Sequence, residues 1–209
     1  MAAQIAFYTN PQSRGAIARW MIEETGIPYE EHVLAFGPPM KGEEYRKINP
    51  MGKVPAIVHD GKVVTEVAAI CLYLADVFRE AGLHPQPHER ADYYRWILFA
   101  AGPVEQATVA KTLSWETPRE RRGMVGFGSY DAVMDTLENH LAQNEYACGD
   151  RFTAADVYIG SHVNWGLMFG SFPRRQAFEA YVARVTARTA YKAARDKDAA
   201  LIAAAQKQG

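Results

Sequence analysis

The stretch KVPAIVHDGKVVTE, residues 53–66, contains two short runs of β-branched and apolar residues on either side of an Asp-Gly pair. Asp60 and Gly61 are typical of a type I′ turn, because both residue types tolerate a positive φ. The stretch therefore predicts a β-hairpin. Its first run also contains Pro55, and a trans proline there would remove a hydrogen bond from the ladder. We expect either an edge position or a cis Val54–Pro55 bond.

Working outward, the sequence predicts a strand–helix–strand unit before the hairpin and a helix after it. Residues 4–9, QIAFYT, are apolar and rich in strand-forming types, and residues 11–26 show helical spacing. A weaker strand signal covers residues 29–35, and residues 36–52 resemble a loop with at most one helical turn. The helix after the hairpin is indicated by residues at i, i+3, i+4 and i+7: Ile70, Tyr73, Leu74 and Val77. The order β-α-β, β-β-α predicts a mixed four-stranded sheet with helices on its faces.

The composition changes at residues 82–89, where GLHPQPHE holds two prolines, one glycine and two histidines. Such a segment is typical of a linker. Beyond it the sequence shows only helical patterns. We therefore predict an α/β domain over residues 1–80, a linker over residues 81–88 and an all-α domain over residues 89–209.

Local signals place helix boundaries inside the predicted all-α domain. The Gly-Pro pair at residues 102–103 predicts a break or kink in the first long helix. Thr117 and Glu120 fit a capping box that opens another helix, and Thr153 with Asp156 repeats this pattern.

Composition and charge limit the classes of function. A net charge of -1 provides no general attraction for nucleic acid or for an anionic membrane. No apolar run approaches about 18 residues, and the N-terminus lacks the features of a signal peptide. The two cysteines, Cys71 and Cys148, lie far apart, and the six histidines show no metal-binding spacing. We expect buried thiols, a reducing cytoplasmic compartment and no metal site.

Three passages together resemble the cytosolic glutathione transferase family: INPMGKVPAI (48–57), TEVAAICLYLAD (65–76) and GDRFTAADVYIG (149–160). The resemblance extends over essentially the whole chain. It implies a thioredoxin-like N-terminal domain and an all-helical C-terminal domain. It also implies glutathione as co-substrate, no further cofactor, an electrophilic apolar second substrate and a symmetric homodimer.

The resemblance implies roles for residues around the hairpin. In the family Pro55 is cis, and the backbone of Val54 pairs with the cysteinyl part of glutathione. Lys53 would reach the glycyl carboxylate, or it is simply a solvated lysine at the end of a strand. Glu66 would face the ammonium of the γ-glutamyl end, and Val67 would contact its carboxylate. The family usually has Ser or Thr in place of Val67, so only the backbone N–H remains for this contact.

The stretch YTNPQSRG, residues 8–15, contains the candidates for stabilising a thiolate. A thiol becomes a strong nucleophile when its pKa falls, and a helix N-terminus with a hydrogen-bond donor lowers it. Comparison with different classes of the family selects Tyr8, Ser13 or Asn10. We favour Ser13, while Asn10 is also a good helix N-cap. The chosen group would donate a hydrogen bond to sulfur and would not act as a covalent nucleophile.

The second substrate would occupy an apolar pocket between the two domains. The candidate lining residues are aromatic or imidazole side chains, which also suit a protein core: Phe36, Trp115, His162 and Trp165. The predicted function is glutathione transfer to an electrophile. The alternatives are a glutathione-dependent peroxidase or isomerase using the same thiolate, and a non-catalytic binding protein on the same fold.

Overall fold

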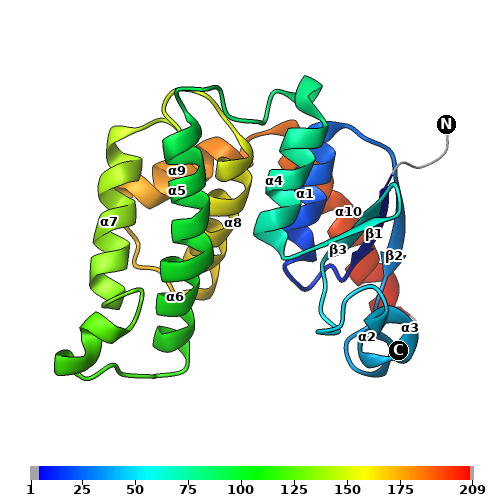
Figure 1. Cartoon of the computed structure of the whole chain (residues 1–209), viewed down its shortest axis with the longest axis horizontal. Helices are drawn as coiled ribbons and strands as arrows, with labels where there is room; N and C mark the ends of the chain where they lie inside the picture. Colours follow the sequence, from blue (N-terminus) through cyan, green and yellow to red (C-terminus); the bar gives the residue numbers. More distant parts are fainter. Residues whose placement is uncertain (1–4, 208–209) are drawn as a thin grey trace. The chain divides into compact units, whose positions relative to one another are not determined.

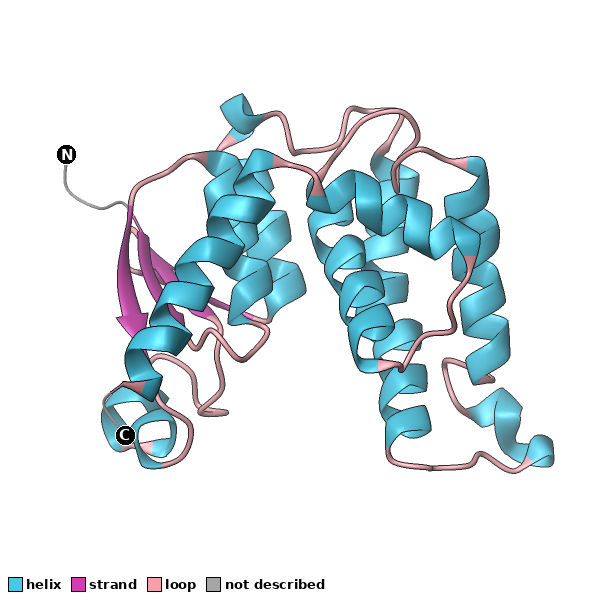
Figure 2. Ribbon diagram, turned by 180° about the vertical axis from the view of Figure 1, so that it is seen from behind, coloured by secondary structure: helices cyan, strands magenta, loops and turns pink. Residues whose placement is uncertain are grey.

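The computed structural model describes residues 5–207, and its contacts divide the chain into two compact units. One unit contains Met1–Leu83 with Ala187–Gly209, and the other contains His84–Thr186. Among the described residues, all strands of the sheet belong to the first unit (Figures 1 and 2). The predicted fold class, a mixed α/β sheet followed by a helical region, is confirmed.

The first unit is built on a mixed four-stranded sheet with the order β2-β1-β3-β4. β1 (Ile5–Thr9) pairs in parallel with β2 (Tyr29–Val33) and antiparallel with β3 (Ala56–His59). β3 pairs antiparallel with β4 (Lys62–Thr65). This confirms the hairpin, whose turn residues Asp60 and Gly61 have φ values of 49° and 73°. Both are positive, as a type I′ turn requires.

Three longer helices belong to this unit: α1 (Gly15–Thr25), α4 (Val67–Val77) and α10 (Thr189–Gln206). α1 packs against both α4 and α10, and α10 is the red helix in Figure 1. The predicted apolar face of α1 is confirmed, because Ile17, Trp20 and Met21 are buried. Gly26 ends the helix in a left-handed conformation with φ 68°.

The start of α1 differs from the prediction, which placed the first helical residue near Pro11. Residues 11–14 form a separate turn, and α1 begins at Gly15. The backbone N–H of Ser13 donates to the carbonyl of Asn10 at 3.1 Å, which is an i to i+3 bond. The Gly15 N–H donates to the Ser13 hydroxyl instead of a backbone carbonyl. Side-chain bonding therefore replaces the first α-helical turn.

Residues 36–52 also hold more helix than the single turn expected. They form α2 (Pro38–Lys41) and α3 (Glu43–Arg46), each of one turn, and Gly42 separates them. A further 3₁₀ turn, η1 (Arg79–Ala81), follows α4.

The position of α10 differs from the predicted domain organisation, which grouped residues 89–209 together. In the structure, α10 belongs to the first unit. Arg19 on α1 donates from Nε to Asp198 on α10 at 2.7 Å, and both side chains are only 1% exposed. Arg188, just before α10, forms two 2.7 Å bonds with Glu24 on α1. These contacts between charged side chains attach the last helix to α1.

The second unit is helical. Its elements are α5 (Arg90–Phe99), η2 (Ala100–Val104), α6 (Glu105–Thr112), η3 (Arg119–Met124), α7 (Tyr130–Gln143), α8 (Ala154–Phe169) and α9 (Gln176–Thr186). η2 is a π-helical turn that contains Pro103, which confirms the predicted irregularity at residues 102–103. Within residues 5–207, no helix is long and apolar enough to span a bilayer.

The capping box predicted at Thr117 and Glu120 is wrong. The segment forms the short 3₁₀ helix η3, whose N-cap is Pro118 and whose cap position makes no side-chain hydrogen bond. None of the residues of η3 is buried. Without an apolar face to bury, a capping signal alone does not sustain an α-helix.

The capping box at the start of α8 is confirmed. The Thr153 hydroxyl accepts a hydrogen bond from Ala155, and Asp156 accepts one from the Thr153 N–H at 2.9 Å. Asp156 also accepts hydrogen bonds from the Ala147 N–H at 2.7 Å and the Tyr181 hydroxyl at 2.8 Å. Burial raises the pKa of Asp156 to about 6, although these donors act against the rise.

This pKa predicts a pH-dependent stability. Because the folded value of about 6 lies above the ordinary 3.8, the folded protein binds this proton more tightly than the unfolded chain does. The stabilisation is complete below about pH 4 and is lost as the pH rises through about 6. We expect the free energy of unfolding of wild type, relative to Asp156→Asn, to fall by about 2–3 kcal/mol over this range. Urea unfolding of wild type and Asp156→Asn at about pH 4 and at about pH 7 tests this. The same difference in unfolding free energy between the two proteins at both pH values would contradict it.

Candidate functional site

The sheet register brings the predicted glutathione residues together at one end of the sheet. Tyr8, near the end of β1, pairs with Ala56 at the start of β3. Ala56 pairs in turn with Thr65 at the end of β4. The turn after β1, the residues before β3 and the start of α4 therefore meet at this end.

The segment before β3 contains the cis peptide bond that the sequence allowed. The Val54–Pro55 bond is cis, Pro55 is buried and Val54 is half-buried. Lys53 is exposed, so its ammonium group is accessible to solvent. Whether Lys53 binds a carboxylate stays a prediction.

Glu66 and Val67 lie at the start of α4, as predicted. α4 begins at Val67, and Glu66 is the N-cap residue, with an exposed side chain. Its φ of 63° is unusual for a residue other than glycine, and such strained backbone is found preferentially at functional sites. Val67 is 7% exposed. The first N–H groups of a helix have no acceptor within the helix, so this end suits an anion.

Ser13 lies in the turn between β1 and α1. Its hydroxyl donates to the Asn10 carbonyl at 2.7 Å and accepts from the Gly15 N–H at 2.9 Å. The Asn10 carbonyl also accepts from the Ser13 N–H at 3.1 Å. The hydroxyl proton can therefore turn toward a ligand without leaving this carbonyl unpaired. The Gly15 N–H meanwhile keeps the oxygen in place.

The side chain of Asn10 makes hydrogen bonds within the protein, and whether it stabilises a thiolate stays a prediction. Its side chain is buried, Nδ2 donates to the Leu34 carbonyl at 2.8 Å and Oδ1 accepts from the Gln12 N–H at 2.9 Å. These bonds favour the capping interpretation, although the cap belongs to the turn before α1.

Tyr8 is half-buried and lies among other rings. It stacks on His32 at a centroid distance of 4.5 Å and lies 5.7 Å from the ring of Tyr45. Its side chain is therefore fixed mainly by ring packing.

Neither cysteine is suited to supply a thiolate. Burial raises the pKa of Cys71 to about 12, and burial likewise raises that of Cys148 to about 12. Cys71 is buried, and Cys148 is half-buried. These raised pKa values disfavour the thiolate form of both side chains at neutral pH.

The four predicted pocket residues occupy different surroundings. Phe36 in the first unit is 56% exposed, and Trp115 after α6 is 65% exposed. His162 on α8 is buried, with Nδ1 3.9 Å from a Glu105 carboxylate oxygen, and Trp165 is half-buried. That these side chains share one pocket between the domains stays a prediction.

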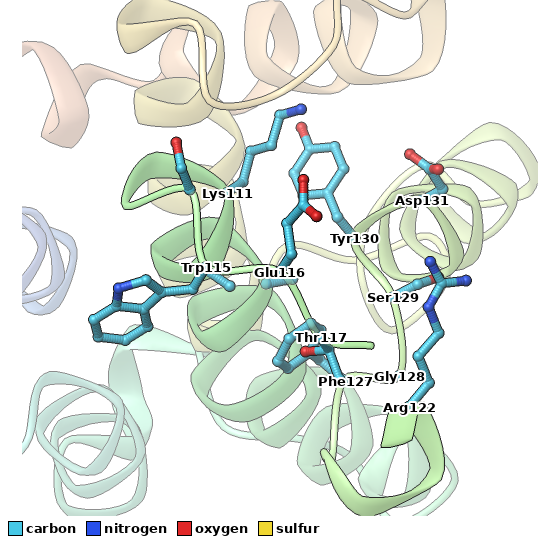
Figure 3. A pocket seen from close by; sticks show the side chains of 13 residues that line it. Lys111, Trp115, Glu116, Thr117, Arg122, Phe127, Gly128, Ser129, Tyr130 and Asp131 are labelled. Carbon is cyan, nitrogen blue, oxygen red and sulfur yellow. The ribbon is translucent and has the colours of Figure 1, made fainter. Parts of the chain in front are cut away.

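Trp115 also borders a cavity within the second unit, between the end of α6 and the start of α7. Its volume is about 460 Å³. Figure 3 shows Lys111 and Tyr130 facing this space, while the Trp115 indole points away from Tyr130. The Lys111 ammonium lies 5.5 Å from the Tyr130 ring centroid.

The prediction missed two residues that contact the segment before the cis bond. The Tyr45 hydroxyl and Asn49 Nδ2 both donate to the Lys53 carbonyl. Asn49 lies within the INPMGKVPAI motif, so its place in the sequence was a usable signal. No sequence signal pointed to Tyr45, because a single aromatic residue in a polar loop does not indicate which group it contacts.

Comparisons with known proteins agree with this geometry. The glutathione S-transferase N-terminal domain model matches residues 15–77, and the C-terminal domain model matches residues 98–165. Together these matches cover more than half of the chain. The chain belongs to the cytosolic glutathione transferase family.

Individual relatives extend the comparison. Protein LigF of Sphingobium is 48% identical over 80 residues, which are 35% of this chain and 30% of that protein. Glutathione S-transferase 3 of Schizosaccharomyces pombe is 32% identical over 168 residues, which are 69% of this chain and 66% of that protein. The chain thus spans less than two thirds of the length of these curated relatives.

A solved structure covers more of the fold. A glutathione transferase homolog from Sulfitobacter with bound glutathione is 25% identical to the chain, with a TM-score of 0.75. The match covers 93% of this chain and 98% of that one.

Proposed function

We propose that the protein is a glutathione transferase, which binds glutathione as a thiolate and joins its sulfur to an electrophilic carbon. The observation that carries this proposal is the convergence of Ser13, the Val54–Pro55 bond and Glu66 at one end of the sheet. The glutathione-bound Sulfitobacter relative supports glutathione as the substrate.

Each part of glutathione has a matching group in this proposal. The exposed Glu66 carboxylate attracts the γ-glutamyl ammonium, and the N–H of Val67 donates to the adjacent carboxylate. The Val54 backbone pairs with the cysteinyl residue as an added strand would. Lys53 attracts the glycyl carboxylate.

The Ser13 hydroxyl stabilises the thiolate in this proposal. It would turn from the Asn10 carbonyl toward the sulfur, which it would stabilise as a hydrogen-bond donor. A donor held near the start of α1 favours the anion over the thiol. The thiolate then attacks the electrophilic carbon, and the leaving group departs.

The partners follow from the same proposal. Phe36, Trp115, His162 and Trp165 would contact an apolar electrophile, and two copies of the chain would form a symmetric homodimer. The family membership supports both statements. A cytoplasmic location fits two thiols that remain unpaired.

Turnover measurements test the proposed reaction. We expect the wild-type protein and glutathione to convert an activated aryl chloride to the thioether with release of chloride. A parallel reaction with an organic hydroperoxide measures oxidised glutathione. Turnover of only the hydroperoxide would favour the peroxidase alternative, and binding of glutathione without either turnover would favour a binding protein.

Glu66→Gln tests the glutathione contacts separately from the chemistry. The change removes the negative charge opposite the ammonium while keeping the size of the side chain. We expect the KM for glutathione to rise by about ten-fold at nearly constant kcat. Glu80→Gln, at another exposed acid of the first unit, is the matched control and should leave KM unchanged. Equal KM values for all three proteins would contradict the role of Glu66.

A further inference from the structure

The carbonyl of Lys53 accepts hydrogen bonds from two buried side chains. The Tyr45 hydroxyl donates to it at 2.7 Å, and Asn49 Nδ2 donates at 2.6 Å. Both side chains belong to residues that are only 4% exposed. The Lys53 carbonyl belongs to the peptide group immediately before Val54, so its direction sets the orientation of the Val54 N–H.

The two donors are held in place by further contacts. Asn49 Oδ1 accepts from the Met51 N–H at 3.1 Å, which fixes the amide group. The Tyr45 ring lies 5.7 Å from the Tyr8 ring. Burial raises the pKa of Tyr45 to about 12, so its hydroxyl keeps its proton and remains a donor at neutral pH.

The residues just before Lys53 are attached to the same short helices. The Lys41 ammonium at the end of α2 donates to the Met51 carbonyl at 3.0 Å and to the Gly52 carbonyl at 2.7 Å. Gly52 has a φ of 57°, and a Cβ there would lie 2.7 Å from the Met40 carbonyl oxygen. Three successive carbonyls are thus held by side chains from residues 41–49.

We propose that Tyr45 and Asn49 are positioning residues for glutathione, because they hold the Lys53 carbonyl and thereby fix the Val54 backbone for pairing with the cysteinyl part of the ligand. This inference rests on the proposed function, in which Val54 binds glutathione. In this proposal both side chains act through the Lys53 carbonyl and not by contact with the ligand or the reacting sulfur. Their effect is to keep the binding backbone in one orientation before the ligand arrives, so they act on affinity and not on the chemical step.

Tyr45→Phe is the first test, because it removes the donor and keeps the ring against Tyr8. The probe is S-methylglutathione, which lacks a free thiol, so its dissociation constant is independent of thiolate stabilisation by Ser13. We expect calorimetry to give a dissociation constant about five-fold higher than that of wild type. The KM for glutathione should rise equally, with kcat unchanged.

Tyr73→Phe is the matched control. The Tyr73 hydroxyl makes a 2.9 Å hydrogen bond with His59 Nδ1 in the same unit, so the change removes a comparable bond away from Lys53. We expect both Phe variants to show similar small shifts in melting temperature. Only Tyr45→Phe should weaken S-methylglutathione binding.

A double variant tests whether the two donors share one task. Asn49→Leu removes the amide donor with a side chain of similar size, at the cost of the bond to the Met51 N–H. Each single variant leaves one donor on the Lys53 carbonyl and the double variant leaves none, so the loss of affinity in Tyr45→Phe/Asn49→Leu should exceed the product of the single losses, and a loss no larger than the greater single loss would contradict a shared task.

The outcomes separate this inference from the proposed function. If wild type binds S-methylglutathione and Tyr45→Phe binds it equally well, the inference is overturned and the proposed function stands. A variant that loses kcat or melting temperature without a change in affinity would show a merely structural role, which also overturns it. If wild type binds no glutathione, the proposed function fails and this inference fails with it.

Discussion

Replacing Arg19 by methionine is expected to lower the free energy of unfolding by about 3–5 kcal/mol, because it leaves a buried carboxylate without its partner. Arg19 and Asp198 are each 1% exposed and joined by a 2.7 Å bond. Arg19 also pairs with Glu31 and donates to the Tyr29 hydroxyl at 3.1 Å. Burial opposes the charge of Arg19, but the two carboxylates outweigh it and raise its pKa. Burial also raises the pKa of Asp198, which Arg19 counteracts.

Urea unfolding followed by circular dichroism measures this loss. Arg79→Met is the control, since Arg79 pairs with Asp76 on the surface, where their side chains are 61% and 69% exposed, and it should cost less than about 1 kcal/mol. Arg19→Met combined with Asp198→Leu should recover much of the loss, because replacing both members of a buried pair is far less costly than removing one. A loss below about 1 kcal/mol for Arg19→Met would contradict this account of how α10 is attached.

Ser13→Ala is expected to lower kcat/KM for glutathione transfer by about 100-fold, the effect typical of removing one donor to a developing or stabilised anion. The variant keeps the backbone bond between the Ser13 N–H and the Asn10 carbonyl, so the turn itself should remain. The Gly15 N–H loses its acceptor, which costs about 1 kcal/mol of stability.

Tyr8→Phe provides the comparison for this prediction. It removes a hydroxyl and keeps the ring stacked on His32. We expect its kcat/KM to remain within about three-fold of wild type. Steady-state kinetics at saturating electrophile measures both variants. A large loss in Tyr8→Phe with little loss in Ser13→Ala would assign thiolate stabilisation to the tyrosine.

Local chemistry made the hairpin of the first unit and the start of α8 in the second unit predictable. Asp60-Gly61 fixed the hairpin because its turn type requires positive φ values, and the register then followed from the short loop. The capping box of Thr153 and Asp156 was also local. The similar signal at Thr117 did not produce an α-helix, since no residue of η3 is buried.

Long-range pairing was not predictable from the sequence. Asp198 lies in an Ala-rich helix where a charged residue usually faces solvent, and its partner Arg19 is 179 residues away. No local pattern therefore indicated that α10 packs against α1. The domain boundary drawn from composition placed α10 with the other helices for this reason.

Only those parts of the candidate site that depend on local sequence signals or on the family motifs were predicted. The proline inside a strand pattern left an edge position or a cis Val54–Pro55 bond open, the family resemblance implied the cis form, and the structure has it. Periodicity indicated the helix that starts at Glu66–Val67. The positive φ of Glu66 and the bond from Tyr45 to Lys53 depend on tertiary contacts. Such contacts leave no periodic trace in the sequence.

The most direct measurement for the central claim is a pH titration of the thiolate absorbance of glutathione bound to wild type and to Ser13→Ala. A free cysteine thiol has a pKa of about 8.5. Thiolate stabilisation at the start of α1 predicts a value below about 7 for glutathione bound to wild type, and a return toward 8.5 in Ser13→Ala. A bound thiol that titrates near 8.5 in wild type would contradict the claim that this site activates glutathione.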